Sequence, residues 1–395
     1  MSADTVHGLK PRGLARLASD LPVSGIRRFF DLASELEDVV SLGVGEPDFF
    51  TPWSVREAAI YAIESGQTAY TANAGLLELR REISRLLDRL YEVAYNPETE
   101  IMLTVGVSQG LDLACRTLLD PGDEVLVPEP CFVAYKPCVT LAGGVPVGIG
   151  CSAENDFRVT LADLAGALTP KTKAILLGYP ANPTGAAMSR VELAAIVDFA
   201  CSKGLYIISD EIYDRLVYDG TEHVCVAGLP GAFPRTITLN GFSKAYSMTG
   251  WRLGYACAPP EILTVMKKIH SHTMMCAPTV SQKAAIEALK GAQKNVADMV
   301  AQYDRRRRII VDGLNQMGLA CPSPRGAFYA FPKVDSTGLS SEEFAERLLL
   351  SERVAVVPGS VFGEGGEGHI RCSYATSIPR IKEALTRMRR FLTSL

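Results

Sequence analysis

Several kinds of segment are absent from this sequence. No apolar run reaches about 18 residues, so no segment predicts a membrane-spanning helix. The N-terminal stretch "MSADTVHGLKPRGLARLASD" has no central apolar block of the kind found in secretory signals. Charge of one sign does not predominate either, since the net charge is −4. Nothing in this balance indicates a nucleic-acid or membrane-surface partner.

The 10 cysteines are scattered, and no two form a CxxC pair. Their spacing argues against zinc fingers and iron–sulfur clusters, and favours a reducing, cytoplasmic location. The 395 residues exceed one ordinary core, so we expect two domains or one large elaborated domain. With 47% hydrophobic and 21% charged residues, the composition is typical of globular proteins.

Short apolar segments alternate with helical segments through the middle of the chain. Near-continuous apolar strands are typical of a sheet covered on both faces. One helix is clearly bounded, because Ser189 and Glu192 form a capping box and Gly204 follows its last turn. The pattern predicts an α/β fold, with a mainly parallel seven-stranded sheet sandwiched by helices. The predicted strands are Ile101–Val105, Glu124–Pro128, Val145–Ile149, Lys173–Gly178, Leu205–Ser209, Thr236–Asn240 and Leu253–Ala258.

The two ends of the chain have a different character. The N-terminal part holds an amphipathic helix, "SGIRRFFDLASEL", and a glycine-rich turn, "SLGVGEPDF". The C-terminal part holds a long charged helix, short strands and a final helix. We therefore expect residues 1–50 and 290–395 to form one smaller α+β domain, beside a large domain of residues 51–289.

Polar residues follow several of the predicted strands. In open α/β sheets, ligands bind at the carboxyl ends of the strands, so these residues are expected to face one ligand. Alone, each has an ordinary alternative role, as a turn residue, a helix cap or a surface charge. In chain order they are the helix-opening "GVSQG", Asn182 in "YPANPTG", Asp210 and Tyr213 in "SDEIY", Lys244 and Arg252.

Together these groups match the chemistry of pyridoxal phosphate. An amine can bond the aldehyde, and a carboxylate can keep the ring nitrogen protonated, so that the ring accepts electrons. A phenol and an amide can bind the ring oxygen. A helix N-terminus and an arginine can hold the phosphate.

The sequence resembles the fold-type I pyridoxal-phosphate enzymes, specifically the class I/II aminotransferases of the aspartate and aromatic group. The resemblance covers nearly the whole chain, and the motifs occur in the family's order. They are "SLGVGEPDF", "YTANAGLLELR", "YPANPTG", "SDEIY", "SKAYSMTGWRLGY", "RGAFYAF" and "IRCSYATS".

The resemblance implies roles for the residues around the cofactor. Lys244 would be the Schiff-base lysine and the proton shuttle, and Asp210 would pair with the pyridinium nitrogen. Asn182 and Tyr213 would contact the ring oxygen. Many relatives carry a phosphate-binding serine where this chain has Gly241. The implied phosphate ligands are Val107, Ser108, Gln109 and Arg252.

The roles of three further residues depend on the resemblance alone. Phe132 would stack on the ring, and Tyr70 would reach the phosphate of the neighbouring subunit in a homodimer. Arg371 would clamp the substrate α-carboxylate, helped by the backbone at Gly43 and by Asn182. Without the family pattern, Phe132 would be read as core, Tyr70 as an exposed turn residue and Arg371 as a surface ion-pair residue.

The implied activity is transfer of an amino group between an L-amino acid and a 2-oxo acid such as 2-oxoglutarate, with aromatic amino acids or aspartate favoured. A β-eliminating C–S lyase on the same fold would share the lysine, aspartate and arginine, so it remains the alternative. A transcription regulator with an aminotransferase-like domain would need a preceding DNA-binding domain, for which we expect no room. Arg27 and Arg28 lie near the expected entrance, although a solvated helix face is the ordinary interpretation.

Three other patterns do not predict sites. "GEGGEG" satisfies GxGxxG, but it follows no suitable strand and opens no strand–helix–strand unit. His270 and His272 would share one face if their segment were a strand, but no third ligand suggests itself, so we expect no metal. "DRRRR" is expected to be a solvated helix face with ion pairs.

Overall fold

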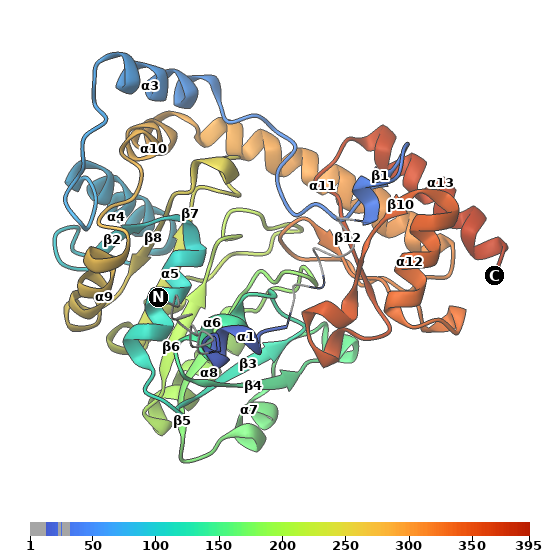
Figure 1. The fold of residues 1–395 in the computed structure, drawn as a ribbon, viewed down its shortest axis with the longest axis horizontal. Coiled ribbons are helices and arrows are strands. Elements are labelled where there is room, and N and C mark those ends of the chain that lie inside the picture. The colour runs from blue at the N-terminus through green and yellow to red at the C-terminus, as the bar shows by residue number, and fades with distance from the viewer. Residues whose placement is uncertain (1–12, 23–24, 26–31) are drawn as a thin grey trace, which may run out of the picture.

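The computed structural model describes residues 13–22, 25 and 32–395 (Figure 1). The described chain begins with a short helix, α1 (Arg16–Ser19). The predicted amphipathic helix lies largely outside the described residues, as do Arg27 and Arg28. Among the described helices, none is long and apolar enough to cross a membrane.

A seven-stranded sheet forms the centre of the molecule, in the order β2-β8-β7-β6-β5-β3-β4. All neighbours are parallel except the pairs that β8 makes with β2 and β7. β8 runs antiparallel because β7 returns to it through a turn rather than a helical crossover. The predicted fold class is confirmed. The strands are β2 (Ile101–Thr104), β3 (Glu124–Glu129), β4 (Val145–Gly150), β5 (Thr172–Leu177), β6 (Tyr206–Asp210), β7 (Thr236–Gly241) and β8 (Gly254–Cys257).

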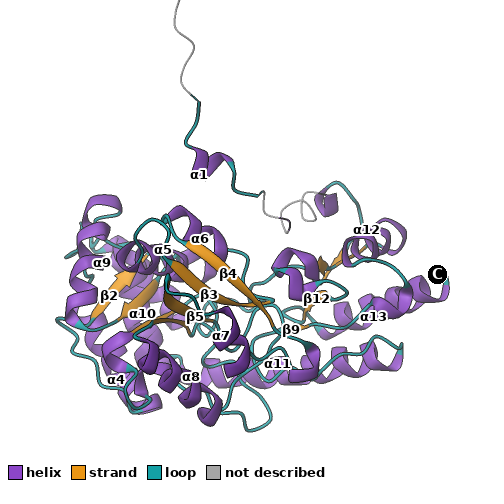
Figure 2. Cartoon of the chain, turned by 90° about the horizontal axis from the view of Figure 1, so that it is seen from below, coloured by secondary structure: helices purple, strands orange, loops and turns teal. Residues whose placement is uncertain are grey.

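Helices cover both faces of this sheet, and Figure 2 shows its strands lying between helices. Successive strand residues supply opposite cores: Leu126 packs in a cluster with α8, whereas Val125 packs in a cluster with α5. This explains why the strands are apolar throughout. The helices of this part are α3 (Trp53–Glu64), α4 (Leu77–Tyr91), α5 (Gly106–Leu118), α6 (Tyr135–Leu141), α7 (Leu161–Ala167), α8 (Arg190–Lys203), α9 (Pro260–Thr273) and α10 (Thr279–Gly291).

The capping signals predicted for α8 are confirmed. Ser189 Oγ accepts a hydrogen bond from the backbone N–H of Glu192, and the Glu192 carboxylate accepts one from the N–H of Ser189. Gly204 ends the helix in the left-handed region, at φ 69°. Only glycine adopts that conformation without a steric cost, so this residue fixes the point where the chain turns toward β6.

A smaller unit beside the sheet joins β1, from the N-terminal part of the chain, to the C-terminal elements (Figure 1). β1 (Val40–Ser41) pairs in parallel with β10 (Val354–Ala355). We propose that this unit comprises residues 1–50 and 290–395, because α11 begins close to that boundary. Its other elements are β9 (Tyr329–Ala330), β11 (Val357–Pro358), β12 (Ile370–Ser373), α11 (Gln293–Gln316), α12 (Ser341–Glu352) and α13 (Ile378–Thr393).

The strand assumed for His270 and His272 is wrong, because both lie in helix α9. A two-residue spacing places side chains on one face of a strand but not of a helix. His270 is buried, and its Nδ1 lies 2.9 Å from Gln109 Nε2. No group of three or more potential metal-ligating side chains (His, Cys, Asp or Glu) occurs among the described residues.

The glycines of "GEGGEG" serve close packing. A Cβ at Gly363 would lie 2.4 Å from the carboxyl carbon of the buried Glu129, and one at Gly366 would lie 2.1 Å from the carbonyl oxygen of Gly359. These contacts require glycine because no side chain fits against them.

Candidate active site

A cavity of about 340 Å³ lies where the sheet meets the smaller unit. Residues that follow β5, β6 and β7 line one side, and residues of β9 and β12 line the other. The predicted site residues that line it are Val107, Ser108, Phe132, Asn182, Asp210, Tyr213, Lys244, Arg252 and Arg371.

Three predicted residues do not line the cavity. Gln109 turns away, since its Oε1 accepts from the N–H of Val105 at 2.6 Å. Gly43 lies behind Arg371 and accepts a hydrogen bond from its Nη2 at 2.6 Å. Tyr70 is 79% exposed on the surface of the chain.

Lys244 lies in the turn between β7 and β8. Its Nζ donates to the carbonyl oxygen of Gly45 at 2.5 Å, and lies 5.7 and 5.4 Å from the ring centroids of Tyr213 and Phe328. Burial, reinforced by the positive charge of Arg371, lowers the pKa of Lys244 to about 8. About a tenth of this amine is therefore neutral and nucleophilic at pH 7, far more than of an ordinary lysine.

Asp210 is the last residue of β6 and is 7% exposed. Its Oδ2 accepts from the hydroxyl of Tyr135 at 2.9 Å, and its Oδ1 accepts from the N–H of Ile212 at 3.2 Å. Burial raises the pKa of Asp210 to about 6, and the two hydrogen bonds oppose that rise. The carboxylate is therefore mostly ionised at pH 7, and can pair with a cationic ring.

Sequence reasoning missed Tyr135, which is buried in the first turn of α6. Its hydroxyl lies over the backbone of Gly178, where a Cβ would come within 2.2 Å of the tyrosine oxygen. Glycine directly after β5 is thus what leaves room for the phenol beside Asp210. The one available signal was that Gly178 interrupts the apolar strand pattern.

Two glycines shape the corner where α5 begins. A Cβ at Gly106 would lie 2.6 Å from Arg252 Nη2, and one at Gly254 would lie 2.7 Å from the N of Val107. The close approach places the Arg252 guanidinium at the start of α5, where unpaired backbone N–H groups already favour an anion.

The same packing accounts for the departure at Gly241. A Cβ there would lie 2.9 Å from the Cα of Gly254, which is too close for a serine without a backbone shift. Ser243 lines the cavity instead, two residues further along the chain.

Arg371 extends from β12 and is 3% exposed. Its Nη1 donates to Asn182 Oδ1 at 2.9 Å, and its guanidinium carbon lies 4.5 Å from the ring centroid of Tyr329. Among the described residues, no carboxylate forms an ion pair with it. A buried guanidinium held by neutral oxygens and a ring face is suited to bind a carboxylate ligand.

The fold and cavity together define a class of protein. Ligand groups gather at the carboxyl ends of a mostly parallel sheet, the arrangement of α/β enzymes. The cavity suits an anionic ligand that carries a carbonyl group, because it offers a nucleophilic lysine, a hydrogen-bonded carboxylate and two arginines.

Comparison with known proteins identifies the family. Residues 37–388 match the family model "Aminotransferase class I and II". The chain is 54% identical over 379 residues to YugH of Bacillus subtilis (strain 168), named only as an aminotransferase, covering 96% of this chain and 98% of that one. It is 45% identical over 371 residues to an aspartate aminotransferase of Pyrococcus abyssi, covering 93% and 95%.

Solved structures agree with this assignment. The aromatic aminotransferase from Pyrococcus horikoshii OT3 superposes with a TM-score of 0.89 at 44% identity, over 93% of this chain and 99% of that one. The chain belongs to the class I and II aminotransferase family, whose members are pyridoxal-phosphate-dependent enzymes.

Proposed function

We propose that this chain binds pyridoxal 5'-phosphate at Lys244, and transfers an amino group between an L-amino acid and a 2-oxo acid such as 2-oxoglutarate. The observation that carries the proposal is the cavity itself. One face offers a lysine with a lowered pKa, and the opposite face offers a buried arginine without an acidic partner.

The residues present fit the cofactor. Arg252 and the start of α5 suit its phosphate, in a corner that requires glycine at position 106. Asp210 suits its ring nitrogen, and Tyr213 and Asn182 suit its ring oxygen. Phe132 lines the cavity beside them and suits the face of the ring. When bound, the cofactor supplies an aldehyde and an electron-withdrawing ring.

The side chains then have distinct tasks. Arg371 binds the substrate carboxylate, which orients the α-hydrogen. Lys244, as a free amine, would take the α-proton at its Nζ and would then deliver it to a different carbon atom, which moves the proton without any net loss. Asp210 stays ionised and keeps a proton on the ring nitrogen, so that negative charge developing during proton removal is stabilised.

The side-chain preference is proposed from relatives. Two relatives at 45% and 44% identity are named as an aspartate aminotransferase and an aromatic-amino-acid aminotransferase, so we propose one of these donors. The test is a panel of amino donors with 2-oxoglutarate. Formation of glutamate with aspartate or an aromatic donor is the expected result. Release of pyruvate and ammonia from cystathionine, without glutamate formation, would instead identify a C–S lyase.

We also propose a cytoplasmic homodimer. Around α3 and the preceding loop, large apolar side chains are exposed: Phe50 by 87%, Trp53 by 60% and Tyr61 by 65%. Tyr70 lies near them in sequence, and a second copy would cover this surface and bring Tyr70 to its neighbour's cofactor phosphate. Light scattering of the holoenzyme should give twice the mass of one chain; a monomeric mass at assay concentration would refute the dimer.

The lowered pKa of Lys244 predicts how cofactor uptake depends on pH. Below a pKa of about 8, each drop of one pH unit lowers the neutral fraction of the Lys244 amine about tenfold. We expect the rate at which the apo-protein bonds pyridoxal phosphate to rise tenfold per pH unit up to about pH 8 and then level off. Stopped-flow absorbance measures this rate; a rate that keeps rising tenfold per unit from pH 8 to pH 10 would contradict the lowered pKa.

Tyr135→Phe is expected to weaken the ring-nitrogen contact. Without the phenol, the carboxylate loses one of its two hydrogen bonds, so the pKa of Asp210 should rise above about 6. One such bond is worth about 1 kcal/mol, so the acid limb of the rate profile should move up by about one pH unit.

Tyr95→Phe is the matched control for this variant. Tyr95 is equally buried, and its hydroxyl lies 3.1 Å from Thr238 Oγ1, outside the cavity. Tyr95→Phe should lower the free energy of unfolding without shifting the pH dependence of the rate. Equal profiles for the two variants would show that the Tyr135 hydroxyl does not support Asp210.

A further inference from the structure

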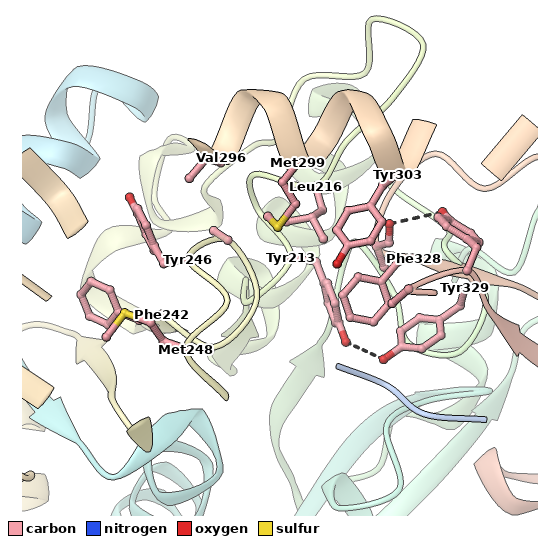
Figure 3. Close-up of a cluster of buried hydrophobic side chains, with 14 of the residues drawn as sticks. Tyr213, Leu216, Phe242, Tyr246, Met248, Val296, Met299, Tyr303, Phe328 and Tyr329 are labelled. Carbon is pink, nitrogen blue, oxygen red and sulfur yellow. Dashed lines mark hydrogen bonds between the residues drawn. The ribbon is translucent and has the colours of Figure 1, made fainter. Parts of the chain in front are cut away.

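Tyr329 touches two of the site's functional groups with different parts of one side chain. It lies in β9, is 1% exposed and lines the cavity. Figure 3 shows its phenol and that of Tyr213 pointing at each other, with their oxygens 2.8 Å apart. The two rings meet edge to face, with centroids 5.9 Å apart, so the hydroxyl contact is fixed by packing on both sides.

The ring of Tyr329 contacts a different group. Tyr329 is paired with Ser373 between the antiparallel strands β9 and β12, which brings its ring beside Arg371. The Arg371 guanidinium carbon lies 4.5 Å from the ring centroid, within the range of a cation–π contact. Because this contact is made to the face of the ring, Tyr329 does not compete with a carboxylate for the guanidinium N–H groups.

Gly45 marks the position of the hydroxyl. A Cβ at Gly45 would lie 2.6 Å from the Tyr329 oxygen, but 3.5 Å from the carbon that bears it. The first distance is a clash, and the second is an ordinary contact. Gly45 also accepts the hydrogen bond from Lys244 through its carbonyl oxygen. The Tyr329 hydroxyl therefore lies between Gly45, the hydrogen-bond partner of Lys244, and Tyr213.

We propose that Tyr329 is a positioning residue with two separable roles: its hydroxyl orients the Tyr213 phenol, and its ring orients Arg371. The inference rests on the proposed function for what those two groups bind. Either hydroxyl can donate in this pair. With the cofactor bound, Tyr213 would turn its proton to the ring oxygen, and Tyr329 would then be the donor to the Tyr213 oxygen. The hydroxyl therefore acts on the cofactor side, and the ring acts on the substrate side.

Two variants separate these roles. Tyr329→Phe keeps the ring and removes the hydroxyl. Tyr213 then becomes a weaker hydrogen-bond donor and stabilises the charged ring oxygen of the cofactor less. The pH midpoint of the bound cofactor's visible absorbance should therefore rise by about one unit. The inhibition constant of 3-phenylpropionate, a carboxylate without an amine, should change by less than about threefold.

Tyr329→Leu removes the ring as well. It should raise the inhibition constant of 3-phenylpropionate, and the KM of the amino donor, by about tenfold relative to Tyr329→Phe. If the leucine variant does not fold, Tyr329→Met replaces it, because its unbranched side chain fills irregular space. An unshifted midpoint in Tyr329→Phe overturns the hydroxyl role, and equal inhibition constants in the Phe and Leu variants overturn the ring role.

A double-mutant cycle with Gly45→Ala tests the hydroxyl role without relying on activity. In the wild-type background the new methyl group displaces the hydroxyl, so thermal stability of the apo-protein should fall and the cofactor midpoint should rise. In the Tyr329→Phe background the same change should cost little, since the clashing atom is gone. Additive effects of the two substitutions would overturn the contact.

Failure of the proposed function gives a different result. If wild-type protein binds no pyridoxal phosphate, or moves no amino group to 2-oxoglutarate, the function fails before any variant is compared. If wild type does both and the variants match it, Tyr329 alone is misassigned.

Discussion

Lys244→Ala is expected to abolish covalent attachment of the cofactor, and to slow amino-acid-driven conversion of the bound cofactor by about 10²–10⁴-fold. The reason is that the lysine holds the only amine lining the cavity among the described residues. Single-turnover absorbance with a saturating amino donor measures the rate. Borohydride reduction followed by peptide mass mapping locates the attachment in the wild type.

Two further variants give this test its controls. Lys244→Arg keeps a positive charge in the cavity but cannot supply a neutral amine, so it should be as impaired as alanine. Lys267→Ala changes a lysine on α9 whose pKa burial also lowers, but which does not line the cavity. It should behave as wild type. Conversion at the wild-type rate in Lys244→Ala would remove the basis of the proposed mechanism.

Asp210→Asn is expected to produce the second large effect. Removing one partner of a buried charge pair costs about 3–5 kcal/mol, which is roughly 10²–10⁴-fold in the rate of proton removal. Cofactor affinity should fall as well, because the protonated ring nitrogen loses its counter-charge. Both quantities are measured separately, by single-turnover kinetics and by fluorescence titration of apo-protein with pyridoxal phosphate.

Asp214→Asn is the matched control for this change. Asp214 is a buried carboxylate four residues further on, and it accepts a hydrogen bond from Tyr91 at 2.6 Å, outside the cavity. Its loss should reduce stability while leaving the kinetics of proton removal in place. If the two asparagine variants lose the same rate, the effect of Asp210 is structural rather than electrostatic.

The sheet was predictable because its signal is local. Each strand is apolar on both faces, since Val125 and Leu126 face different cores. The residues that follow these strands share one edge for topological reasons, so Asp210 and Lys244 could be placed together before any coordinates.

The supporting residues of the site were not predictable in the same way. Tyr135 and Tyr329 are buried aromatic residues in a helix and a strand, where such residues ordinarily fill a core. Only their partners in space, Asp210 and Tyr213, distinguish them. Contacts of this kind join distant parts of the chain and leave no periodic pattern in the sequence.

The basic run "DRRRR" shows the limit of composition as a guide. It was expected to be a solvated face with ion pairs, and the ion pairs are present. Arg306 is only 8% exposed, however, and pairs with Asp48, while Arg307 is 2% exposed and pairs with Asp304 and Asp219. Arg305 and Arg308 are exposed, as expected. The other two arginines are buried because Asp48 and Asp219, from other segments, lie opposite them.

The pairing of β1 with β10 has a consequence for biosynthesis. β1 can pair with β10 only after Val354 has been synthesised. All seven strands of the central sheet are synthesised well before then. A growing polypeptide could thus complete the lysine-bearing layer early, with Arg371 still untranslated. Nascent chains stalled after residue 300 would then carry the proposed cofactor-binding residues of the sheet without Arg371, the proposed ligand of the substrate carboxylate.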